Sequence, residues 1–147
     1  MIWKPHATVA AIIERDGQFL MVEEESDGRI VFNQPAGHLD PNESLVQAAI
    51  RETREETAWD FSPQFIVGVY LWTHESTQRS FLRAVFCGSC DNHDPQQQLD
   101  KEIIRSVWMT RDELLAQPEK LRSPMVMRCI DDYLAGKRYP LELLINL

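Results

Sequence analysis

Two runs of apolar residues lie in the first part of the chain, and polar or turn-forming residues bound them, which is a pattern of β-strands. Residues 7–14 and 18–24 are rich in aliphatic side chains, and between them lies Asp16-Gly17, a dipeptide that tight hairpin turns favour. We therefore predict a β-hairpin at this turn. A further short strand is expected over residues 29–33, where it leads into the turn before Gly37.

Over residues 44–57 the apolar positions recur with the period of an α-helix instead. Ser44-x-x-Gln47 has the spacing of a capping box, so the helix should begin there. At about 100° per residue, one arc should pack on a core: Leu45, Val46, Ala49, Ile50 and Thr53. The glutamates of the helix lie at the edge of this arc, and we expect them to be neither fully buried nor fully exposed.

The second half of the chain continues this mixture of elements. Further strands are expected over residues 65–73, 80–88 and 102–109, with a polar, Gln-rich loop over residues 91–100. These patterns predict a single domain over residues 1–147. Its class is α/β (α+β), a mixed β-sheet sandwiched between α-helices.

Two more helices have start signals of their own. Thr110-x-x-Glu113 is a second capping box. Ser123-Pro124 begins a third helix, which should end near Gly136 because glycine favours the left-handed position after a helix. The apolar tail over residues 139–147 should dock on the body of the protein.

The net charge of −8 restricts the partners of this chain, because the phosphate backbone of a nucleic acid duplex repels such a protein. No stretch approaches the roughly twenty apolar residues of a membrane span, and the first residues do not resemble a signal peptide. Three cysteines do not make a disulfide framework, and the single C-x-x-C, Cys87 to Cys90, has no second pair to complete a zinc site. We therefore expect a cytoplasmic protein, monomeric or homodimeric, without a membrane or duplex partner.

Acidic residues are crowded into one segment, Gly37-x5-Glu43-x7-Arg51-Glu52-x2-Glu55-Glu56. Like charges at i,i+3 and i,i+4 on a helix are each destabilising by roughly 0.2–0.5 kcal/mol. A cluster that lowers stability in this way indicates a binding site for positive charge. Because the ligands are all oxygens, the favoured ion is a hard cation, Mg²⁺ or Mn²⁺, rather than zinc.

The same segment resembles the Nudix box, G-x5-E-x7-R-E-U-x-E-E-x-G-U, in which U is a bulky aliphatic residue. Two positions depart from it: Ala58 replaces the second glycine, and Thr53 occupies an aliphatic position. A left-handed helix end at Ala58 would cost roughly 1–2 kcal/mol because of its Cβ. Segments along nearly the whole chain resemble the NudJ-type bacterial Nudix phosphatases in order and spacing: residues 4–6, 33–39, 81–83, 121–124 and 138–142.

The resemblance implies a magnesium-dependent hydrolase of small phosphorylated molecules. Its substrates would be nucleoside di- and triphosphates and a pyrimidine pyrophosphate from thiamine synthesis, attacked by water that the cation activates. The box is shared with hydrolases of damaged nucleotides, dinucleoside polyphosphates and capped RNA ends, so these remain alternatives. A nucleotide-sensing module without turnover is a further alternative, although no glutamate of the box is lost.

The chemistry of the cation suggests roles for the helix residues. Glu56 is expected to be the principal metal ligand, Glu55 a co-ligand, and Glu52 a ligand or the base that orients water. Arg51 is expected to orient Glu52, and Glu43 to hold the loop through a salt bridge.

The resemblance adds two further ligand positions. One is the carbonyl of Gly37, which the family's loop brings to the metal. The other is a carboxylate from a loop after the central strands, for which Glu102 is the first candidate and Asp100 the alternative.

Four residues outside the helix are candidates for contact with the substrate. Arg83 lies in an apolar strand, where a partly buried guanidinium needs an anion, either a phosphate or a structural carboxylate. His38 follows Gly37 and could touch phosphate, while Lys4 and His6 match the family's first strand and could reach the mouth of the site. Trp72 could stack on a base, but core packing is the favoured interpretation.

Overall fold

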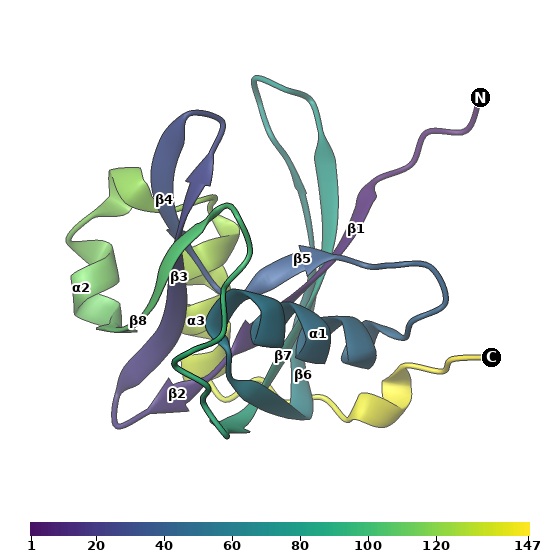
Figure 1. Ribbon diagram of the computed structural model, residues 1–147. Coiled ribbons are helices and arrows are strands. Elements are labelled where there is room, and N and C mark those ends of the chain that lie inside the picture. Colours follow the sequence, from purple (N-terminus) through teal and green to yellow (C-terminus); the bar gives the residue numbers. More distant parts are fainter.

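The computed structural model describes all 147 residues as two β-sheets with three α-helices around them (Figure 1). One sheet has the strand order β5-β1-β7-β6. In the other sheet β3 lies between β4 and β8, and the short β2 pairs with the first residues of β3. β1 runs parallel to β7, and every other strand pair is antiparallel. The α+β class and the mixed pairing are as predicted, but the strands form two sheets rather than one.

The element bounds complete this description. The strands are β1 (His6–Ile12), β2 (Glu14–Arg15), β3 (Gln18–Ser26), β4 (Arg29–Asn33), β5 (Ala36–His38), β6 (Asp60–Thr73), β7 (Ser80–Asp91) and β8 (Ile103–Thr110). The α-helices are α1 (Leu45–Thr57), α2 (Arg111–Leu115) and α3 (Met125–Leu134), and two 3-10 turns are η1 (Pro118–Lys120) and η2 (Leu141–Leu143). No helix has both the length and the apolar character needed to cross a bilayer.

The Asp16-Gly17 turn is present, with both residues in the left-handed region at φ 53° and 78°. The strand that enters it is shorter than predicted, because of residues 7–14 only Glu14, in β2 with Arg15, pairs with β3. β1 ends at Ile12, and it belongs to the other sheet, beside β7. Residues 9–13 are all buried, which is typical of a strand covered on both faces.

The sheet of β5, β1, β7 and β6 lies between helices, as predicted. α1 packs on one face above an apolar cluster that includes Val9 and Phe86. α3 covers the opposite face, over a cluster that includes Val85 and Ile130. The C-terminal tail docks in part, because Leu141 and Leu144 pack on the first of these clusters while Leu143 and Ile145 stay exposed.

Helix α1 has the predicted start and end. Ser44 caps it through the capping box with Gln47, and Ala58 follows it in the left-handed region at φ 61°. The buried arc differs from the prediction: its members are Ala48, Ala49, Thr53, Glu56 and Thr57, while Ile50 is exposed. The two alanines let the helix approach the sheet closely, and the rotated arc brings Glu56 inward.

Candidate active site

A cavity of about 690 Å³ is lined by residues of both sheets and of α1. Most of the site residues predicted from the sequence line it: His6, Gly37, His38, Glu52, Glu56, Arg83 and Glu102. Arg51, Glu55 and Lys4 do not. Two hairpin turns flank the cavity, β3–β4 and β6–β7, and Arg79 Nη2 lies 3.5 Å from Asp27 Oδ2 between them.

Three carboxylates in this cavity come together closely enough to share one cation. One oxygen each of Glu52, Glu56 and Asp100 lies within 4.8 Å of the others. Glu56 is only 7% exposed, so the prediction of a half-exposed side chain was wrong for this residue. Because the group offers oxygens only, it suits Mg²⁺ or Mn²⁺.

The electrostatics of the three carboxylates also favour a cation. Burial raises the pKa of Glu52 to about 7, although the Arg51 guanidinium opposes this. The pKa of Glu56 is raised well above its ordinary value by burial, and that of Asp100 is raised by burial and by Glu55. Without a cation, burial and mutual repulsion therefore oppose ionisation of the whole group, and a bound divalent ion would relieve both.

Gly37 is required by the close approach of Glu52. A Cβ built on Gly37 would lie 2.1 Å from the Glu52 carboxyl carbon, a contact that cannot exist without a shift. The neighbouring residues hold β5 against the helix: Ala36 N–H donates to Glu56 Oε1 over 2.9 Å, and Arg51 Nη2 donates to the His38 carbonyl over 2.9 Å. The strand that carries Gly37 is thus clamped to the carboxylate face of α1.

Arg51 gathers the acidic side chains around it. It contacts Glu43 through two hydrogen bonds of 3.0 and 2.7 Å, and its Nη1 donates to Glu52 over 2.8 Å and to Glu55 over 2.9 Å. The hydrogen bond from Arg51 lowers the pKa of Glu43. Glu43 Oε1 also accepts the N–H of Asp40, so this ion pair ties the loop before α1 to the helix. The orienting role of Arg51 and the loop-holding role of Glu43 stay predictions, and these contacts place both residues where those roles need them.

Asp100, rather than Glu102, joins the carboxylate group. The loop between β7 and β8 folds back onto the end of α1, where Asp94 N–H donates to the Ala58 carbonyl and Gln97 Nε2 to the Arg54 carbonyl. Asp100 N–H donates to the Glu55 carbonyl over 3.1 Å, which fixes Asp100 beside the helix. Glu102 lines the cavity from an exposed position outside the group.

Of the remaining sequence candidates, His6 and His38 line the cavity, whereas Glu55 and Lys4 do not. Glu55 contacts Arg51 and lies outside the three-oxygen group. His6 and His38 face each other across the cavity wall, with His6 Nδ1 3.1 Å from His38 Nε2. Burial and the neighbouring His6 lower the pKa of His38. Lys4 is exposed and does not reach the cavity lining.

Arg83 is more deeply buried than predicted, at 3% exposure. Its guanidinium donates to Gln34 Oε1 over 3.2 Å and to Asn33 Oδ1 over 2.9 Å, and neither partner is a carboxylate. The sequence left two interpretations of Arg83 open, a phosphate contact and a structural salt bridge. The structure shows no salt bridge to Arg83. A buried cation that has only neutral partners and lines a cavity is well placed for an anionic ligand.

Sequence reasoning missed one ion pair in the cavity wall, between Glu24 and Arg122. Glu24 is 6% exposed and accepts from Arg122 Nη1 and, over 3.4 Å, from Asn33 Nδ2. The sequence does contain a signal for this ion pair, because Glu24 lies two residues after the buried Val22 and should share its face of the strand. A carboxylate on that face needs a cation close by.

Comparisons with known proteins agree with this geometry. Residues 4–128 match the family model described as NUDIX domain. The chain is 41% identical to "Phosphatase NudJ" of Escherichia coli K12 and of Shigella flexneri, over 97% of its own length and 92% of theirs. Among solved structures, a "NUDIX hydrolase from Nitrosomonas europaea" superimposes with a TM-score of 0.96 at 48% identity, covering 98% of each chain.

Proposed function

Because this chain belongs to the Nudix hydrolase family, whose members act on phosphoric anhydrides, we propose that it cleaves diphosphate linkages in nucleoside di- and triphosphates and in the pyrimidine pyrophosphate of thiamine synthesis. The observation that carries the proposal is the group of Glu52, Glu56 and Asp100 in a cavity whose other wall holds the buried Arg83. The phosphatase name of relatives 41% identical to the chain supports the hydrolysis of a phosphate linkage.

The three carboxylates would hold Mg²⁺ or Mn²⁺, and the Gly37 carbonyl and Glu55 are the further ligand candidates. When bound, such a cation offsets the negative charge of the phosphate oxygens and makes water a better nucleophile. The close fit of Glu52 against Gly37 and the hydrogen bond from Ala36 to Glu56 hold two of the carboxylates in place. The oxygens therefore need little rearrangement to bind an ion.

The side chains around the carboxylates have separate tasks. Glu52 is the proposed base, because its carboxylate lines the cavity beside Glu56 and Asp100, where a water on the cation would lie within its reach. Arg51 holds one Glu52 oxygen through Nη1 and so orients the other. Arg83, His38 and His6 are the proposed phosphate contacts, since all three line the cavity.

The proposal predicts metal-dependent turnover that needs Glu56. Purified protein would be offered nucleoside di- and triphosphates and the pyrimidine pyrophosphate, with Mg²⁺, Mn²⁺ or EDTA, and the products identified by phosphorus NMR. Glu56→Gln should lower turnover by orders of magnitude, whereas Glu142→Gln, on an exposed turn, should not. Hydrolysis in oxygen-18 water would show which phosphorus is attacked.

Two results would contradict the proposal. The first is a folded Glu56→Gln variant with full, metal-dependent activity. The second is wild-type protein that binds nucleotides tightly but turns over none of the substrates, which would favour the sensing module instead.

A further inference from the structure

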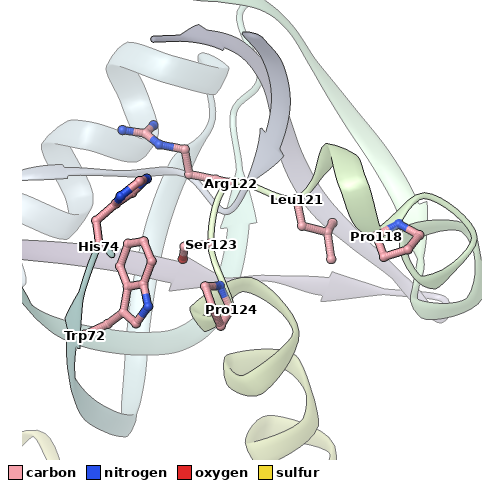
Figure 2. Close-up of a pocket in the computed structure, with 7 residues that line it drawn as sticks. All are labelled: Trp72, His74, Pro118, Leu121, Arg122, Ser123 and Pro124. Atoms are coloured by element: carbon pink, nitrogen blue, oxygen red, sulfur yellow. The ribbon is translucent and has the colours of Figure 1, made fainter. Parts of the chain in front are cut away.

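A second cavity, of about 320 Å³, adjoins the carboxylate site, and we call it the side pocket (Figure 2). Its walls come from the end of β6, with Trp72 and His74, and from the segment that leads from η1 into α3. Trp72, His74, Arg122 and Ser123 line both cavities, so the two spaces meet at these residues. Nothing in the proposed hydrolysis uses the side pocket.

Trp72 is presented to this space rather than to the protein interior. Trp59 and Trp108 pack on the apolar cluster beneath α1, but Trp72 packs on neither apolar cluster. Its ring neighbours are Phe81, stacked at 6.0 Å between centroids, and His74, edge-on at 5.3 Å. In Figure 2 the indole and the imidazole stand on one side of the pocket, opposite Pro124 and Ser123. Core packing therefore does not account for Trp72.

The charge of the lining differs sharply between the two cavities. No acidic residue lines the side pocket, whose only fully charged side chain is Arg122. Proline and leucine side chains complete an apolar wall, at Pro118, Leu121 and Pro124. The carboxylates of Glu52, Glu56 and Asp100 lie in the main cavity, which shares Arg122 with the side pocket. A ligand that fills both spaces would therefore be apolar and flat at one end and would carry phosphates at the other.

Arg122 is held where the two cavities meet. Its guanidinium pairs with the buried Glu24, and its backbone N–H donates to the Phe32 carbonyl over 2.9 Å. The side chain remains 39% exposed, so it can still contact a ligand. A planar guanidinium can bind phosphate oxygens and also stack on a ring, which suits a position between the two parts of a substrate.

We propose that the side pocket binds the aromatic ring of the diphosphate substrate, stacked on Trp72, and so selects diphosphates that carry a heteroaromatic ring. This inference rests on the proposed function, because it assigns the organic part of the same substrate. A volume of about 320 Å³ is near the lower end of the roughly 300–1,000 Å³ of small-molecule sites, which suits a single ring system. The ring is either a nucleobase or a free pyrimidine linked to the diphosphate through one carbon.

The test compares three diphosphates in four proteins. Cytidine diphosphate, the pyrimidine pyrophosphate of thiamine synthesis and isopentyl diphosphate would be assayed with wild type, Trp72→Leu, Trp72→Phe and the control Trp3→Leu. Trp3 is 66% exposed and lines neither cavity. The readout is kcat/KM for each ring-bearing substrate divided by kcat/KM for the alkyl one, and thermal melting checks that each variant is folded.

Trp72→Leu should lower this ratio by roughly 5- to 150-fold, the factor for the 1–3 kcal/mol of a stacked base, and mainly through KM. Trp72→Phe should keep most of the wild-type ratio, and Trp3→Leu should leave the ratio unchanged. The ring-bearing substrate whose kcat/KM ratio falls further in Trp72→Leu identifies the source of the ring. An unchanged ratio in Trp72→Leu, or an equal loss on all three substrates, would overturn the inference while leaving the hydrolase proposal intact.

Absence of turnover in wild type would instead count against the proposed function. In that case calorimetry with an uncleavable methylene-bridged cytidine diphosphate still tests the side pocket. The affinity should fall by a similar factor in Trp72→Leu and recover in Trp72→Phe, and equal affinities in all proteins would refute ring binding.

Discussion

Replacement of Glu52 by glutamine should flatten the pH dependence of stability in the metal-free protein. Burial raises the pKa of Glu52 from the ordinary value of 4.5 to about 7. Between these two pH values the folded protein keeps a proton that the unfolded chain has released. The folded state then binds more protons than the unfolded one, so the free energy of unfolding must fall as the pH rises through this window.

The size of the effect follows from the shift. At about 1.36 kcal/mol per pH unit, the difference between pKa values of 4.5 and about 7 amounts to roughly 3 kcal/mol, all of which is lost above pH 7. Solvent screening reduces this figure little, because the Glu52 side chain is only 13% exposed. Glutamine preserves the shape and still offers an oxygen to Arg51, but it has no proton to release. The variant should therefore be the more stable protein at pH 8 and equal to wild type at pH 4.

Urea unfolding in EDTA at pH 4 to 8 measures this difference directly, and Glu142→Gln, an exposed glutamate, is the matched control. Wild type should lose about 3 kcal/mol more than Glu52→Gln across the window. Added Mg²⁺ should then stabilise wild type at pH 8 by binding linkage, and stabilise the variant less. Parallel pH profiles for wild type and Glu52→Gln would refute the assignment of a strained, buried carboxylate.

Three further changes test separate parts of the site. Gly37→Ala places a Cβ 2.1 Å from the Glu52 carboxyl, so Mg²⁺ affinity measured by calorimetry should fall at least tenfold; unchanged affinity would contradict the close fit. Asp100→Asn should weaken Mg²⁺ binding much more than Glu102→Gln, and the reverse order would restore Glu102 as the ligand. Ser44→Ala removes the capping box and should lower the free energy of unfolding by about 1 kcal/mol with kcat preserved, as urea unfolding and assay would show.

Local signals explain what the sequence predicted well. The capping box at Ser44 and the Asp16-Gly17 turn depend on residues within a few positions of one another, and both are present. The carboxylate helix follows from the same kind of information. Fixed spacing along one helix is therefore enough to bring Glu52 and Glu56 together.

The features that the sequence did not predict depend on contacts between residues far apart in the chain. β1 was expected beside β3, yet it lies in the other sheet beside β7, a choice that depends on which faces are covered. The preference for Glu102 over Asp100 rested on position in the loop, whereas a backbone hydrogen bond to Glu55 decides which acid reaches the group. Burial of Arg83 against two amide oxygens likewise depends on residues about 50 positions away.

The loop that carries Asp100 determines how local opening of the protein would disrupt the carboxylate site. Three of its groups donate hydrogen bonds to carbonyls at the end of α1, at Arg54, Glu55 and Ala58. Fraying of the last helical turn and release of the loop are therefore one event, and Asp100 leaves with it. Local opening of this unit would abolish cation binding while the sheets stay folded, and a bound cation would in turn slow hydrogen exchange there.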